Sequence, residues 1–109
     1  MKTISEKYIR ERSQNLFTND DLYDVCLETI KANATATKLE QLINSVIYNN
    51  INYLFRQRQF DNCSFTHGVY YNDYKDTMEV SYRRLQQCND NLFDYCLQNN
   101  IDFSTLFEK

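Results

Sequence analysis

Apolar residues recur every three or four positions along most of the chain, which is the spacing of one face of an α-helix. The clearest run of apolar residues ends near residue 59. It begins just after Thr37, which together with Glu40 has the spacing of a capping box. The pattern predicts a helix over 37–59, about 30 Å long, on which the other helices pack. Asparagines at 49, 50 and 52 predict a bend or break within it, because Asn lowers helix propensity.

Two helices are predicted before this central one. Thr3 and Glu6 have capping-box spacing and open a first helix that ends near Phe17. Asn19 is expected to cap a second helix that runs through Ile30, with acidic residues in its first turn.

A further helix is predicted after Asn72 or Asp73, since apolar residues up to Cys96 recur close to a heptad. The segment 89–91, Asn-Asp-Asn, could split this helix in two. It is expected to stop at 99–100, Asn-Asn, before a last apolar turn that folds back onto the bundle and carries Phe103, Leu106 and Phe107.

The region of about 60–71 is predicted as the longest loop, with a short hairpin as the alternative. It contains the only Gly and the only His of the chain. The chain also has no Pro. Because Gly and Pro form the turns between strands, their scarcity argues against a many-stranded fold. We therefore expect one all-α domain over 1–109, a bundle of four to five helices. Its predicted core is Leu42, Ile43, Val46, Ile47, Leu54, Met78, Leu85 and Leu92.

Composition is that of a folding chain, with 42% hydrophobic and 25% charged residues among 109. Thirteen Asn and nine Tyr suggest an AT-rich coding genome, as in viruses, phages and low-GC bacteria. The N-terminus has no apolar run long enough for a signal peptide, and no stretch is apolar enough to span a membrane. A cytoplasmic location is expected, in the host cytoplasm if the source is viral.

The candidate chemistry is sparse. Cys63, His67, Cys88 and Cys96 could supply four zinc ligands, but their spacing is not that of a tight zinc site. Cys63 and His67 could form a nucleophile and base, but no motif that would complete a catalytic site accompanies them. The cysteines are read as free thiols. The sequence therefore predicts no metal, no cofactor and no enzyme activity.

The formal net charge of −3 does not favour a nucleic-acid binder. Aromatic and basic residues instead suggest a protein-binding surface at Tyr70, Tyr71, Tyr74, Arg83 and Arg84, because Tyr and Arg are enriched in binding hot spots. The competing interpretation is that most tyrosines fill the core.

We expect a small non-catalytic interaction module, such as a viral or phage regulator, inhibitor or adaptor that binds a host or viral protein. One alternative is a nucleic-acid-associated protein that uses arginine clusters, chiefly Arg10, Arg12, Arg56 and Arg58. Another is a self-assembling structural protein that forms a homodimer or larger oligomer through its heptad-like helix.

Overall fold

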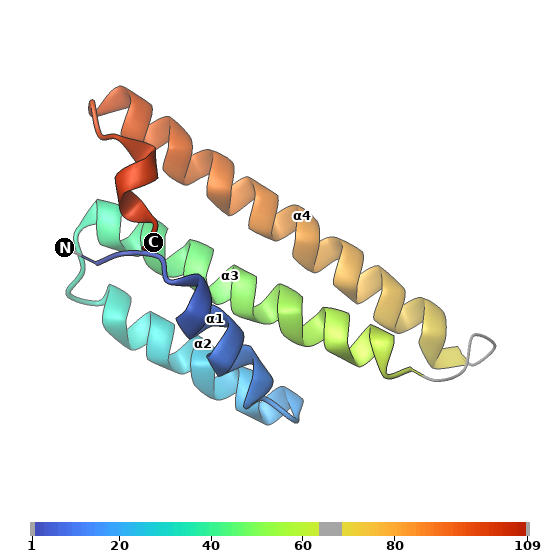
Figure 1. The fold of residues 1–109 in the computed structure, drawn as a ribbon. Coiled ribbons are helices and arrows are strands. Elements are labelled where there is room, and N and C mark those ends of the chain that lie inside the picture. The colour runs from blue at the N-terminus through green and yellow to red at the C-terminus, as the bar shows by residue number, and fades with distance from the viewer. Residues whose placement is uncertain (1, 64–68, 109) are drawn as a thin grey trace.

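Over residues 2–63 and 69–108 the chain forms an all-α bundle of four helices and a short 3-10 helix, so the predicted fold class is confirmed (Figure 1). The computed structural model describes residues 2–63 and 69–108, with side chains described over 2–63 and 71–108. None of the helices in these ranges has the length and apolarity needed to cross a membrane. The elements are α1 (Glu6–Gln14), α2 (Asn19–Asn33), α3 (Lys38–Asp61), α4 (Val69–Gln98) and η1 (Phe103–Leu106).

Helix α3 is the centre of the fold. Figure 1 shows α1 and α2 on one side of it and α4 on the other. The pairing of α3 with α4 is the most extensive contact between elements, and the molecule is elongated, 49 × 25 × 23 Å. The predicted role of the central helix is therefore confirmed.

Local capping sets where the helices begin. The Thr37 capping box is confirmed, because the Glu40 N–H donates to Thr37 Oγ1 and the Thr37 N–H donates to Glu40 Oε1. Helix α2 is capped by Thr18 in a second box with Asp21, one residue before the predicted cap. Helix α1 is capped by Ser5. The predicted cap at Thr3 was wrong, because the chain just before Ser5 is extended and pairs with the C-terminal segment.

Both long helices run further than predicted. The amides of Asn49 and Asn50 donate to carbonyls four residues earlier, at 2.8 and 3.0 Å, and α3 continues unbroken. Helix α4 begins at Val69, so the predicted cap at Asn72 or Asp73 was wrong. It is also not split at Asp90. Residues 60–61 and 69–71 of the predicted loop are helical, and the predicted hairpin falls mostly on 64–68, outside the described residues.

The core lies along α3. Five of the eight predicted core residues are buried, whereas Leu42, Leu54 and Met78 are partly exposed. Leu42 and Leu54 pack against the buried cluster from its edge. The buried apolar residues of α3 include two that were outside the core prediction, Ile51 and Phe55.

The C-terminal segment closes one end of the bundle, as predicted. Asn100 has a φ of 56°, which lets the chain turn back after α4. Leu106 is completely buried, and Phe103 packs edge-on against Phe93 with ring centroids 5.4 Å apart. The Ile4 N–H donates to the Leu106 carbonyl at 2.6 Å, so the two ends of the described chain lie together.

Candidate functional site

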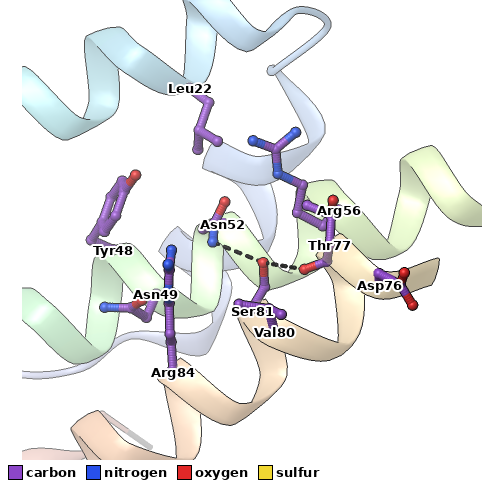
Figure 2. A pocket seen from close by; sticks show the side chains of 10 residues that line it. All are labelled: Leu22, Tyr48, Asn49, Asn52, Arg56, Asp76, Thr77, Val80, Ser81 and Arg84. Carbon is purple, nitrogen blue, oxygen red and sulfur yellow. Dashed lines mark hydrogen bonds between the residues drawn. The ribbon is translucent and has the colours of Figure 1, made fainter. Parts of the chain in front are cut away.

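A cavity of about 380 Å³ opens where α2, α3 and α4 meet, and we call it the central groove. Figure 2 shows α3 along its floor, α4 as one wall and Leu22 of α2 as the other. Its lining is mostly polar. It consists of Leu22, Tyr48, Asn49, Asn52, Arg56, Asp76, Thr77, Val80, Ser81 and Arg84.

Helical periodicity places these side chains together. On α3 the lining residues Asn49, Asn52 and Arg56 lie one, four and eight positions after Tyr48. On α4 the lining residues lie one, four, five and eight positions after Asp76, and they are Thr77, Val80, Ser81 and Arg84. Residues four apart lie one above the other on a helix, so each helix offers the groove one stripe.

Two hydrogen bonds fix the floor of the groove. Asn52 Nδ2 donates to Ser81 Oγ at 3.1 Å, and Ser81 Oγ donates to the Thr77 carbonyl at 2.8 Å (Figure 2). Asn52 and Ser81 are both buried. They tie α3 to α4 with paired polar groups, and Ser81 stands where the heptad pattern of α4 would place an apolar residue.

Two arginines from different helices face this space. Arg56 is half-buried, and one of its terminal nitrogens donates to Asn19 Oδ1 and to Gln59 Oε1, both at 2.9 Å. Burial lowers the pKa of Arg56, and the nearby Tyr48 hydroxyl acts in the opposite direction. Arg84 extends from α4 toward α3 (Figure 2). Over 2–63 and 71–108 neither guanidinium forms a salt bridge, since Arg12 with Glu28 is the only pair within 4 Å there.

The pKa of the Tyr48 hydroxyl is affected by the same two arginines. Burial raises its pKa, the neighbouring Cys26 thiol raises it further, and Arg56 and Arg84 each lower it. Tyr48, Arg56 and Arg84 all line the same groove. The central groove offers positive charge and hydrogen-bond donors to an anion, in an acidic protein.

The predicted partner-binding residues do not share one cavity. Tyr71 packs against Phe60, with ring centroids 5.2 Å apart, and the side chain of Tyr70 lies outside the described residues. Tyr74 lines a separate cavity beside Leu16 and Phe55. Arg84 lines the central groove, whereas Arg83 lies in a different hollow with Tyr53, Met78 and Tyr82.

The arginines of the nucleic-acid alternative are also dispersed. Arg10 is exposed on α1, and Arg12 is bound to Glu28 at 2.8 Å. Arg58 donates to the carbonyls of Ser13 and Leu16, just where α1 ends, and Arg56 belongs to the central groove. Arg12 and Arg58 thus serve contacts within the chain.

The cysteines occupy different environments. Cys63 follows the end of α3, Cys88 accepts a hydrogen bond from Asn49, and Cys96 is buried in the core. His67 lies outside the described residues. Within the described ranges, no three His, Cys, Asp or Glu side chains come together as a group able to hold a metal ion.

A second surface feature is an apolar stripe on α2. Tyr23, Leu27 and Ile30 are 60%, 45% and 60% exposed. Their spacing of four and three residues places them on one face, and we call them the α2 stripe. The opposite side of α2 is occupied by the core through Leu22 and Val25.

Sequence reasoning missed most of the groove. Ser81 carried a signal, because it is a polar residue within the otherwise apolar stripe of α4, whereas Asn52 carried none beyond its low helix propensity. That Arg56 and Arg84 line one groove was not signalled in the sequence, since it depends on how α3 and α4 pair. Thr77 and Val80 likewise have no distinctive sequence context.

No protein-family model, curated protein or solved structure matches this chain. Functional inference therefore rests on the central groove and the α2 stripe.

Proposed function

We propose that this protein is a small non-catalytic interaction module, a regulator, inhibitor or adaptor that binds a partner protein in the cytoplasm. The α2 stripe carries the proposal, because it is an exposed apolar face on a helix whose other side is already packed. The four cysteines of the protein form no disulfide, which suits a reducing compartment. Because the composition is rich in Asn and Tyr, we favour a viral or phage protein that acts on a host protein.

The energetics favour a partner on the α2 stripe. Fully burying an apolar side chain of this size is worth about 1.5–3 kcal/mol relative to leaving it exposed. Apolar anchors at i, i+4 and i+7 are also how one helix docks into the groove of another protein. Tyr23 adds a large rigid surface with a polar end, a residue type enriched in binding hot spots.

The two alternatives have weaker support. A nucleic-acid site would draw on Arg12 and Arg58, whose guanidinium groups already bond within the chain. Self-assembly through α4 would need its heptad positions, yet Leu85, Leu92 and Cys96 are buried on the side that pairs with α3.

The proposal is tested by quantitative affinity capture from the native or infected host, with nuclease-treated lysate in parallel. The wild type is compared with Leu27→Asp, which places a charge in the α2 stripe. The matched control is Leu97→Asp, the same change at a 68% exposed position on α4. Circular dichroism checks that all three fold alike.

We expect a stoichiometric protein partner that survives nuclease, is lost with Leu27→Asp and is retained with Leu97→Asp. Recovery that collapses with nuclease would favour the nucleic-acid alternative. Capture of the bait alone, with a mass that rises with concentration, would favour self-assembly. Equal loss in both variants would contradict the assignment to the α2 stripe.

A further inference from the structure

We propose that the central groove is the specificity site of this interaction and binds a single Glu or Asp side chain of the partner between Arg56 and Arg84. The proposal rests on the proposed function and adds the chemistry of the partner segment. Its basis is the juxtaposition, from two helices, of guanidinium groups that no carboxylate of the described residues neutralises.

No carboxylate of the described residues compensates the charge of Arg56. Arg56 is half-buried, and its hydrogen-bond acceptors, Asn19 and Gln59, are both neutral. Asp76 also lines the groove, but it forms no salt bridge, and Figure 2 shows its carboxylate at the edge, away from both guanidinium groups. A partly desolvated positive charge without a counter-ion favours an incoming anion.

Arg56 is also pre-organised for binding. The two neutral acceptors hold one terminal nitrogen of Arg56 and leave the rest of its fork without a bond to any described residue. The guanidinium fork matches the two oxygens of a carboxylate. Because Arg56 is already held in place, binding a carboxylate costs less conformational entropy than it would at a free surface arginine.

The charges of α4 limit which anion fits the groove. Helix α4, which supplies Arg84, also carries Asp73, Asp76, Glu79, Asp90 and Asp94. These acidic residues would repel a polyphosphate backbone running along the helix, whereas one carboxylate needs only the local pair of arginines. The apolar side chains of Leu22 and Val80 on opposite walls suit apolar neighbours of that carboxylate. The preferred ligand is therefore an acidic residue between apolar ones.

The test uses an acetylated, amidated peptide with one glutamate flanked by leucines, and a second peptide with glutamine in its place. Binding to the full chain is followed by ¹⁵N chemical-shift titration. Arg84→Glu is the test variant, because Arg84 is exposed and makes no hydrogen bond to the described residues. Arg83→Glu is the matched control, with the same helix and the same net charge but a different hollow.

We expect saturable binding of the glutamate peptide, with shifts around Asn49 and Asn52. Arg84→Glu should weaken it about tenfold or more, the scale of a lost charge-assisted contact, and Arg83→Glu less than about twofold. No binding by the wild type, equal binding of the glutamine peptide, or equal losses in the two variants would each overturn the proposal. Tighter binding of a single-stranded oligonucleotide, lost with Arg84→Glu, would also overturn it in favour of a phosphate ligand.

The two proposals fail separately. If Leu27→Asp abolishes partner capture while Arg84→Glu leaves peptide binding intact, only the groove assignment is wrong. If peptide binding follows Arg84 but no host protein is captured, the groove binds carboxylates and the interaction function is wrong.

Discussion

Asn52 and Ser81 join the floor of the central groove to the core. Ser81 occupies a position on the α3–α4 contact where an apolar residue would be expected from the helical pattern, and it accepts a hydrogen bond from the buried Asn52. A buried polar pair is tolerated because each member satisfies the other, and the loss of one partner strands the second. These two residues therefore act as a unit in stability.

Replacing Ser81 with Ala should destabilise the protein by about 1–3 kcal/mol, since the buried Asn52 amide loses its acceptor. The free energy of unfolding, measured in urea, checks the value. Asn52→Leu in the Ser81→Ala background should recover part of the loss, because no buried polar group is then left unpaired.

The control for this pair is an exposed hydrogen bond. Gln87 Nε2 donates to Asn91 Oδ1 on the surface of α4. Gln87→Ala should change the free energy of unfolding by less than about 0.5 kcal/mol. A similar cost for Gln87→Ala and Ser81→Ala would contradict the role given to the buried pair.

At the scale of elements, helix starts depend on capping carboxylates. Asp21 accepts hydrogen bonds from the N–H groups of Phe17 and Thr18, at 2.8 and 3.0 Å, and these hold its pKa below the ordinary 3.8. Glu40 plays the same part at α3, where bonds from Thr37 lower its pKa. A carboxylate whose pKa is lowered in the folded state stabilises the folded protein when the pH is above the ordinary pKa of the group.

Asp21→Asn should therefore lower the melting temperature near about pH 6, and its deficit relative to the wild type should shrink as the pH falls below the ordinary pKa of Asp21. Thermal unfolding followed by circular dichroism across this range measures both trends. Asp20→Asn is the control, because it removes a charge from the same turn without breaking a capping bond. A deficit that stays constant down to low pH would contradict the assignment to Asp21.

The elements were largely predictable because their determinants are local. The Thr37 capping box, the apolar stripe of α3 and the turn at Asn100 all act within a few residues. The expected break at 49–52 failed for a tertiary reason, because Asn52 bonds Ser81 across to α4 and packing outweighs the modest cost of Asn in a helix.

The site was less predictable than the fold. Arg83 and Arg84 are adjacent in sequence and were expected to share one surface, yet consecutive helical residues differ by about 100° in direction and these two line different hollows. Arg84 and Arg56 line the same groove because of the register between α3 and α4, which no local pattern encodes.

At the scale of the whole molecule, burial is unevenly distributed along α4. Over its described side chains, 71–98, the buried ones are Ser81, Leu85, Leu92 and Cys96, and only Ser81 of these precedes the middle of the helix. The later half also meets the C-terminal closure, where Phe93 packs on Phe103 and Leu106 is buried. The first turns of α4 lie at the opposite end, beside the end of α3 (Figure 1).

Amide hydrogen exchange should show this gradient. Local opening costs less free energy where few apolar side chains are buried, so amides over 74–78 should be protected at least about tenfold less than those over 88–96. Arg84 lies between the two regions and Arg56 opposite the first, so the same experiment with the glutamate peptide bound should raise protection over 74–84 and leave 88–96 unchanged. Uniform protection along α4 would show that the helix opens as one unit, and the groove would then have a rigid wall in the absence of any ligand.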